Sequence, residues 1–438
     1  MSRRMRIEDK YGSPDERYSY KSALIDWMRR THEPVCAGRI TVRIAEKLGF
    51  CWGVDRAVAM VWDAIRKNPG RRLWLLNQII HNPKVNEDFR QNGVQFIFGR
   101  YAEPGGFDRV QRGDVVIIPA FSAEVEHLMR MEAIGCEIVD TTCPWVEKPH
   151  RRVRKYVEDG CTVVIHGQPG HDETRATCSL VDSLQGKWLV LRGHDDADLL
   201  CAALRGEAPL VPLRERFARQ SSRDFEPERD LRRIGMVNQT TMLATESAEI
   251  AKKVGAAVAA RDERHRFESG DHPVAAELSR APTSLAGTAT SVASAPSPLL
   301  PANSKPSSFR DFDTICPATQ DNQDAVIALT GATSPDLFLV LGGYDSSNTA
   351  NLLRAAGAKR GTYHVQEPTS ITADAIRHRD PATGLEAITY GWLPSGSLQI
   401  ALSAGASTPD TELAAVIRRL AAAVGATVDE PQAATTVK

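Results

Sequence analysis

One pattern occurs three times along the chain, and it limits the possible folds more than any other feature. In each copy a cysteine stands at the start of an amphipathic segment with helical periodicity, and a glycine ends that segment. A short apolar segment typical of a buried strand follows, and then a cluster of small polar residues. The copies begin at Cys51, Cys143 and Cys316. Because the period is as long as a domain, the pattern predicts three similar α/β units and argues against a solenoid.

The distance from each cysteine to its polar cluster is nearly constant. It is 30, 28 and 30 residues, counted to His81, His171 and Ser346. A later strand in each copy also ends in small polar residues, among them Thr240 and Ser407. In open α/β sheets a ligand binds beyond the carboxyl ends of the strands. Three such edges facing one axis would bring three thiols and three polar clusters to a common centre.

Length and charge exclude several classes of protein. The 438 residues allow two to four domains. With 54 Lys and Arg against 55 Asp and Glu, the chain has no global charge that favours nucleic acid or a membrane surface, and a basic cluster at 151–155 is interpreted as a solvated helix face. No apolar run approaches the roughly 18 residues of a membrane span, and the first 30 residues lack the apolar core of a secretory signal. We therefore expect a cytoplasmic protein without nucleic-acid or membrane partners.

The chain divides into six predicted segments. They are a polar N-terminal extension at 1–36, α/β unit 1 at 37–142, α/β unit 2 at 143–262, an insertion at 263–308, α/β unit 3 at 309–424 and a flexible tail at 425–438. From Glu268 to Ser308 there is no Phe, Trp or Tyr, and five prolines follow residue 281. Such a composition buries too little apolar area to offset the entropy lost on ordering, so we expect the insertion to be disordered.

The three repeated cysteines are predicted metal ligands, because unpaired N–H groups at a helix start favour the thiolate. The eight cysteines show no dense spacing typical of a disulfide framework, which leaves the thiols free. Three thiolates could hold zinc or a cubane iron–sulfur cluster. Zinc sites usually contain a C-x-x-C pair, which is absent, so a cluster at a domain junction suits the long spacings better. The other five are expected to be small buried apolar residues: Cys36, Cys136, Cys161, Cys178 and Cys201.

The polar clusters supply hydrogen-bond donors at strand ends and helix starts, where phosphate oxygens bind. These donors are His81, His171, Ser346, Asn348 and Ser407. Glu173 and Thr240 add a proton donor and a hydroxyl relay, which a reductive C–O cleavage needs because the leaving hydroxyl must be protonated. Each residue alone is equally explained as a cap or turn residue. Their matching places in three repeats favour a shared anion.

Eight ordered motifs resemble those of the LytB family of 4-hydroxy-3-methylbut-2-enyl diphosphate reductases, over roughly 41–420 apart from the insertion. They are Gly49-Phe50-Cys51-Trp52-Gly53-Val54, Ile80-His81-Asn82-Pro83, Asp140-Thr141-Thr142-Cys143-Pro144, His171-Asp172-Glu173, Gln239-Thr240-Thr241, Ile315-Cys316-Pro317-Ala318-Thr319, Ser346-Ser347-Asn348-Thr349 and Gly405-Ala406-Ser407-Thr408-Pro409. The chain looks like the chloroplast and cyanobacterial branch, because Trp52 follows the first cysteine and Glu124 stands where many bacterial members have a histidine.

The resemblance implies a pseudo-threefold trefoil of α/β units around one [4Fe–4S] cluster per chain, held by Cys51, Cys143 and Cys316. It implies the last step of the methylerythritol phosphate route to isoprenoids, in which the allylic diphosphate is reduced to isopentenyl and dimethylallyl diphosphates. Electrons would come from ferredoxin or flavodoxin, and protons through the catalytic residues Glu173 and Thr240. The resemblance implies that the diphosphate is held by His81, His171, Ser346, Ser347, Asn348 and Ser407.

Three positions depart from the family pattern. Asp345 replaces the usual Asn, Asn322 replaces an Arg, and Glu124 replaces the histidine. An extra carboxylate near a diphosphate repels it, so we expect weaker affinity and the same reaction. Two other functions stay open: a non-catalytic iron–sulfur redox sensor, and a hydratase resembling the aconitases. Glu173 argues against the sensor, and dependence on an electron donor separates the hydratase.

Overall fold

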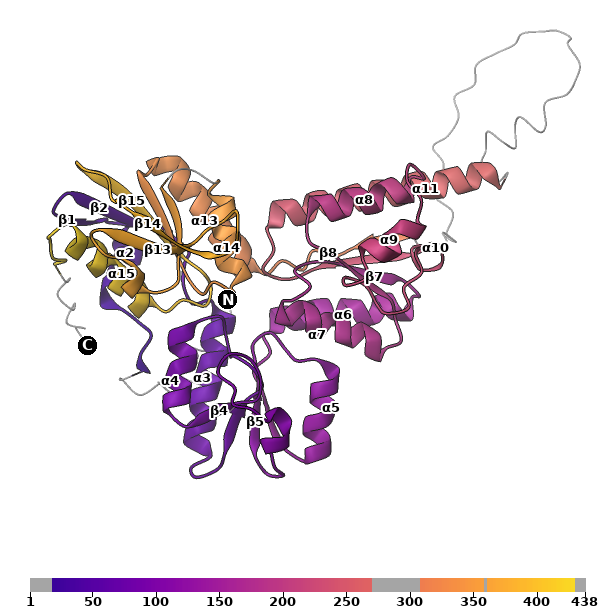
Figure 1. The fold of residues 1–438 in the computed structure, drawn as a ribbon, viewed down its shortest axis with the longest axis horizontal. Coiled ribbons are helices and arrows are strands. Elements are labelled where there is room, and N and C mark those ends of the chain that lie inside the picture. Colours follow the sequence, from indigo (N-terminus) through magenta and orange to yellow (C-terminus); the bar gives the residue numbers. More distant parts are fainter. Residues whose placement is uncertain (1–17, 270–307, 358–360, 430–438) are drawn as a thin grey trace, which may run out of the picture.

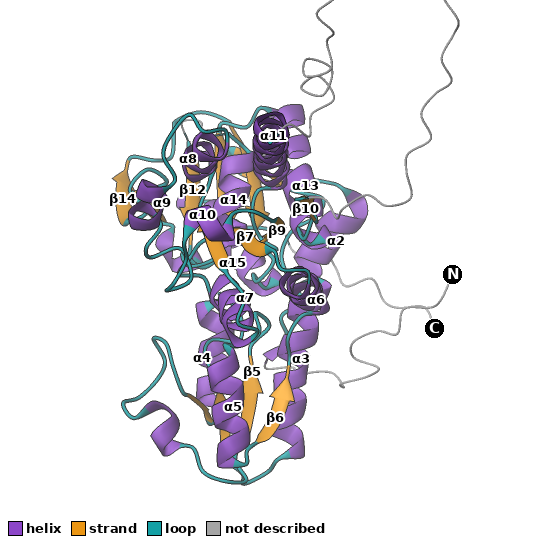
Figure 2. Cartoon of the chain, turned by 90° about the vertical axis from the view of Figure 1, so that its right-hand side faces the viewer, coloured by secondary structure: helices purple, strands orange, loops and turns teal. Residues whose placement is uncertain are grey.

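The computed structural model describes residues 18–269, 308–357 and 361–429 of the chain. These residues form three α/β units, each with its own sheet and with helices on both faces (Figure 1). The predicted α/β class with three units is confirmed at this level. Figure 2 shows the first unit edge-on below the other two, with β5 and β6 running beside α5.

The first sheet has the strand order β4-β3-β5-β6, and all its pairings are parallel. Its central strands β3 and β5 are buried on both faces, and hydrophobic cores lie on either side. The elements of this unit are α3 (Trp52–Lys67), β3 (Leu73–Leu75), α4 (Pro83–Gln91), β4 (Val94–Phe96), η2 (Gly106–Arg109), β5 (Val115–Ile118), α5 (Val125–Ile134) and β6 (Glu137–Asp140).

The second sheet has the order β10-β9-β7-β8, and it is also entirely parallel. Apolar residues of α8 and α11 cover one face, and those of α6 and α7 cover the other. The elements are α6 (Pro144–Glu158), β7 (Thr162–His166), α7 (Asp172–Ser183), β8 (Trp188–Leu191), α8 (His194–Leu204), α9 (Val211–Arg216), α10 (Pro227–Asp230), β9 (Ile234–Asn238), α11 (Ala244–Glu268) and β10 (Phe309–Asp311).

The third sheet contains the same parallel core, β2-β15-β11-β12, extended by antiparallel strands at both edges. Helices α2 and α15 cover one face, and α13 and α14 the other. The elements are α2 (Ala23–Thr31), β1 (Val35–Ala37), β2 (Ile40–Ile44), α13 (Pro317–Thr333), β11 (Leu337–Leu341), α14 (Ser347–Ala355), β12 (Thr362–Val365), η3 (Pro368–Ser370), β13 (Ala375–Arg379), β14 (Glu386–Tyr390), β15 (Leu398–Ala404) and α15 (Asp410–Ala423).

Two predicted unit boundaries are corrected by the strand pairing. Strand β2 was expected in unit 1, but it pairs with β15 in the third sheet, with Ile40 opposite Leu398. Strand β10 was expected in unit 3, but it pairs with β9 in the second sheet. Strands β2, β6 and β10 therefore each precede a cysteine, and each ends the parallel run of one sheet: β6 in the first, β10 in the second and β2 in the third. Alternating apolar residues identify a strand but not its partner, which explains the error.

The predicted ends of the outer segments also change. The extension at 1–36 contributes helix α2, whose Leu24, Ile25 and Met28 are buried in the core of the third unit. Helix α11 continues to Glu268, six residues past the predicted end of unit 2, although its last buried residue is Arg261. Residues 270–307 of the predicted insertion and 430–438 of the predicted tail lie outside the described residues.

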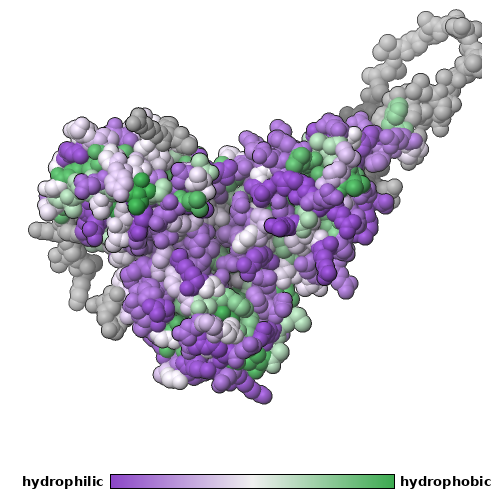
Figure 3. Space-filling view, in the orientation of Figure 1, coloured by the Kyte–Doolittle hydropathy of each residue, from purple (hydrophilic) through white to green (hydrophobic). Residues whose placement is uncertain are grey.

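The face of the molecule drawn in Figure 3 is largely hydrophilic, and its hydrophobic residues form small separate patches. Among the helices that the structure describes, none has the length and apolarity that crossing a bilayer requires.

Candidate active site

The three repeated cysteines occupy equivalent structural positions. Each is the N-cap of a helix, in extended conformation, directly before α3, α6 or α13. Each donates its backbone N–H to a carbonyl in the loop that follows a central strand of the neighbouring sheet, at 3.0–3.2 Å. The acceptors are Ala406 for Cys51, Ala120 for Cys143 and Thr240 for Cys316. All three thiols line one cavity of about 80 Å³. The predicted positions at helix starts are confirmed.

A glycine keeps the space between the thiols open. A Cβ atom on Gly53 would lie 2.5 Å from Cys143 Sγ and 3.9 Å from Cys51 Sγ, so only glycine leaves this space open. A cubane iron–sulfur cluster takes each thiolate on a separate iron, and three separate thiols around an open space suit such a group.

Burial and the helix starts act in opposite directions on the pKa values of the three thiols. Burial raises the pKa of Cys51 to about 12, the nearby Cys316 and Cys143 add to the rise, and the N–H of Val54 lowers it only in part. Burial likewise raises the pKa of Cys143 and Cys316. The helix-start effect is real but smaller than desolvation. A bound metal ion or iron–sulfur cluster would favour the thiolate form.

Glu173 is a buried carboxyl that carries a proton near neutral pH. It lies in the first turn of α7 with 2% of its surface exposed. Its two oxygens accept from the backbone N–H of Thr240 at 2.7 Å and from the Thr240 hydroxyl at 2.8 Å. Burial raises its pKa to about 7, and the two hydrogen bonds from Thr240 partly oppose this. A group of this kind can donate a proton inside the cavity.

Two histidines from different units face each other across the cavity. Nε2 of His81 lies 3.2 Å from Nε2 of His171, and both rings are more than nine-tenths buried. His171 is the N-cap of α7, and its Nδ1 accepts from the backbone N–H of Glu173 at 3.2 Å. Burial, and then the neighbouring His81, lowers the pKa of His171 to about 3. The ring of Phe121 stacks on His81 at a centroid distance of 4.2 Å.

The third unit contributes small polar groups to the same cavity. Ser346 is the N-cap of α14, and its Oγ accepts from the Thr349 N–H at 3.2 Å. The Asn348 side chain accepts from the Ala406 N–H at 2.9 Å. All the sequence-predicted site residues line this cavity: Cys51, Cys143, Cys316, His81, His171, Glu173, Thr240, Ser346, Ser347, Asn348 and Ser407.

Comparison with known proteins agrees with this geometry. The family model described as LytB protein matches residues 42–269 and 282–421. The chain belongs to the LytB family. It is 37% identical over 420 residues to the 4-hydroxy-3-methylbut-2-enyl diphosphate reductase of Synechococcus sp. (strain RCC307), which covers 95% of this chain and 91% of that relative. It is 38% identical over 424 residues to the reductase of that name in Synechococcus sp. (strain CC9311), covering 95% and 94%.

A solved structure shows the same fold. The chain matches the E-1-hydroxy-2-methyl-but-2-enyl-4-diphosphate reductase from Plasmodium falciparum with a TM-score of 0.55 and 18% identity, over 86% of each chain. At this identity the likeness concerns the fold alone.

The departures from the LytB pattern do not place a free carboxylate in the cavity lining. The Glu124 carboxylate accepts from Arg175 at 2.6 and 3.0 Å. Asp345 accepts from the Gln78 side chain at 2.8 Å, and neither acidic residue lines the cavity. Asn322 is buried but does not line the cavity, and its Nδ2 has no hydrogen-bond partner among the described residues.

Several residues of the site have no recognisable signal in the sequence. Gln78, which contacts His81, stands in a loop where no periodicity marks it. Phe121 and Trp145 line the cavity, although aromatic residues usually indicate core. Of the five cysteines expected in the core, Cys161, Cys178 and Cys201 are buried as predicted, Cys136 is half-buried and Cys36 is exposed. Cys36 points outward because it alternates with buried residues on the edge strand β1.

Proposed function

We propose that this chain reduces 4-hydroxy-3-methylbut-2-enyl diphosphate to isopentenyl and dimethylallyl diphosphates, as the last step of the methylerythritol phosphate pathway. One observation carries the proposal: three thiols, a buried carboxyl and a set of anion donors line one cavity. Relatives named as this reductase are 37% and 38% identical over nearly the whole chain. The reaction consumes two electrons and two protons and releases water.

We propose further that Cys51, Cys143 and Cys316 hold one [4Fe–4S] cluster per chain, at the centre of a pseudo-threefold trefoil. The shared parallel strand order of the three sheets and the equivalent hydrogen bonds of the three cysteines support this arrangement. When bound, such a cluster supplies electrons singly and offers the substrate hydroxyl an iron position without a protein ligand.

The remaining residues bind the substrate and deliver protons. His81, His171 and the start of α14 offer N–H and O–H donors to the diphosphate, where a helix N-terminus also favours negative charge. Ser347, Asn348 and Ser407 complete this set. Glu173 donates a proton to the leaving hydroxyl, and Thr240 holds both of its oxygens in place. Because these groups are buried, water is largely kept from the reacting atoms.

A basic surface hollow beside the cavity is suited to the electron donor. Trp145 lines the inner cavity, and it also lines an outer hollow of about 450 Å³ together with Lys148, Arg152 and Phe312. The Lys148 ammonium lies 4.9 Å from the centre of the Phe312 ring, and the Arg152 guanidinium 4.0 Å. These positive charges would attract an acidic ferredoxin or flavodoxin to the outer hollow, where the Trp145 side chain lies between the docked protein and the inner cavity.

An anaerobic turnover assay tests the function. The purified protein is given 4-hydroxy-3-methylbut-2-enyl diphosphate with and without a reduced ferredoxin, and the products are separated by chromatography. We expect the two isoprenoid diphosphates only when the reductant is present. Conversion of the substrate without reductant indicates a hydratase, and no conversion with a loaded cluster indicates a sensor.

A further inference from the structure

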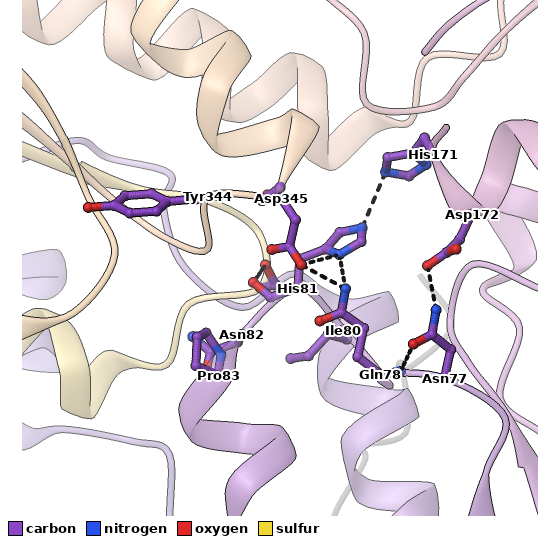
Figure 4. A network of polar contacts seen from close by, with 12 residues as sticks. Asn77, Gln78, Ile80, His81, Asn82, Pro83, His171, Asp172, Tyr344 and Asp345 are labelled. Carbon is purple, nitrogen blue, oxygen red and sulfur yellow. Dashed lines mark hydrogen bonds and ion pairs between the residues drawn. The ribbon is translucent and has the colours of Figure 1, made fainter. Parts of the chain in front are cut away.

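One polar network joins the first and third units at the edge of the anion site. Gln78 stands in the loop between β3 and α4, and only 9% of its surface is exposed. Its Nε2 lies 2.8 Å from Nδ1 of His81 and 2.8 Å from Oδ2 of Asp345. Figure 4 shows Gln78 beneath the His81 ring, with Asp345 beside both. Both polar contacts of the Gln78 side chain thus involve its NH2 group, and its Oε1 has no partner among the described residues.

The carboxylate of Asp345 decides which way the Gln78 amide faces. Burial raises the pKa of Asp345, but the hydrogen bond from Gln78 and the charge of the nearby Arg100 lower it and favour the ionised carboxylate. An ionised carboxylate only accepts hydrogen bonds, so it requires the NH2 group and not the carbonyl of Gln78 at 2.8 Å. The second N–H of the same group then donates to His81.

This contact fixes the tautomer of His81. Because Nδ1 accepts from Gln78, the ring proton of the neutral imidazole must be on Nε2. Asp345 lies 3.7 Å from Nδ1, which is too far to compete as a hydrogen-bond acceptor. In His171, Nδ1 accepts from the Glu173 N–H, so its ring proton is also on Nε2.

The two Nε2–H groups are therefore both donors at the same point of the cavity. Their nitrogens lie at hydrogen-bond distance, 3.2 Å, but with a proton on each neither can accept from the other, so the two N–H groups repel until an acceptor oxygen lies between them. Such a pair is ready for an acceptor oxygen that approaches both, and it needs no extra proton. Other charged groups around the pair are Asp345 beside His81, Arg175 near His171 and Arg100 near Asp345.

We propose that Gln78, oriented by Asp345, is a positioning residue that holds His81 in the tautomer that donates to the substrate's diphosphate. The inference rests on the proposed function for the identity of the anion. The sequence analysis expected the Asp345 carboxylate to repel the diphosphate. In this proposal Asp345 instead supports diphosphate binding, because it accepts from the Gln78 amide and so orients it. The site then binds its anion through two Nε2–H donors.

Gln78→Glu tests the proposal, because a glutamate can only accept from Nδ1. The proton of neutral His81 then moves to Nδ1, and Nε2 can donate to an anion only after the ring takes up a second proton. The anaerobic holoprotein is titrated with inorganic diphosphate from pH 6 to 9 by calorimetry. The ratio of variant to wild-type Kd is used at each pH, because ionisation of the ligand itself cancels.

We expect the ratio of variant to wild-type Kd to rise about tenfold per pH unit above the pKa of the His81 imidazolium in the variant. The ratio should level off at about 10 to 150. The KM for the substrate should rise with it while kcat stays unchanged. The matched control is Gln91→Glu, which removes an exposed amide that also donates to a carboxylate, at 3.0 Å from Glu87. Its ratio should stay near one at every pH.

A second variant guards against misfolding, since Gln78→Glu places two carboxylates in contact. In Gln78→Glu/Asp345→Asn the asparagine donates to the new carboxylate, and the same pH-dependent ratio is expected. A ratio that does not change with pH in a folded variant overturns the assignment of Gln78, even if the wild type turns over normally. Absence of turnover in the wild type contradicts the proposed function and leaves the binding result unaffected.

Discussion

Replacing Glu173 by Gln separates proton delivery from substrate binding. The amide keeps the shape of the carboxyl, and its oxygen still accepts from the Thr240 N–H, while the Thr240 hydroxyl turns to accept from the new NH2 group. What is lost is a transferable proton. We therefore expect the variant to keep its cluster and its affinity for substrate, and kcat to fall by a factor of about 100 or more, roughly 2.7 kcal/mol in the barrier.

The pH dependence of the wild type follows from the same residue. With a pKa of about 7, Glu173 is half protonated at pH 7 and about one-tenth protonated at pH 8. Bound diphosphate adds negative charge, which raises the pKa further, so kcat should fall with rising pH only above about pH 7. The assay is anaerobic steady-state kinetics with saturating reductant at each pH, and Glu173→Gln should show no such fall.

The reasoning is refuted if Glu173→Gln turns over at the wild-type kcat with only a raised KM. Glu173 would then be a binding residue, and the proton would have to come from elsewhere. The control is Glu87→Gln, which changes an exposed carboxylate that pairs with Arg90 and should leave both constants unchanged.

Three further changes address the remaining parts of the site. Gly53→Ala places a methyl group 2.5 Å from Cys143 Sγ, so the iron content should drop, although alanine favours the helix by about 1 kcal/mol. The control Gly331→Ala, whose added methyl group meets no atom within 4 Å, should retain full iron, and equal iron content in the two variants contradicts the proposed site. His171→Ala removes a donor to a charged group, so Kd for substrate should rise about 10- to 150-fold in calorimetry with the cluster intact, and an unchanged Kd contradicts its role. Lys148→Glu/Arg152→Glu should lower kcat/KM for reduced ferredoxin and weaken its salt dependence, while turnover with dithionite stays normal; equal losses with both reductants contradict a docking role.

The residues that line the cavity were easier to recognise in the sequence than the boundaries of the three α/β units. Cys51, Cys143 and Cys316 were recognisable because helix caps and polar strand ends are local features, and they recur in each copy. Strand pairing is not local: β2 and β10 have the same apolar alternation whichever sheet they join, so their place depends on backbone contacts with β15 and β9. The N-terminal extension has an amphipathic piece near 20–30 that predicts α2, but this pattern does not show that Leu24 packs in the core of the third unit.

Electrostatics was the least predictable part of the site. Helix starts suggested thiolates, yet burial decides the protonation of Cys51, and burial depends on the whole fold. Asp345 suggested repulsion of a diphosphate, and only its contact with Gln78, 267 positions away, shows where its charge is directed. No spacing rule links two such positions in a chain.

Metal analysis of cysteine variants tests the central claim most directly. The wild type, Cys143→Ser and the control Cys161→Ser, which alters a buried thiol outside the cavity, are purified without oxygen, and iron and sulfide are measured per chain. The account predicts about four of each in the wild type and in Cys161→Ser, and nearly none in Cys143→Ser. Full iron and sulfide in Cys143→Ser would contradict it.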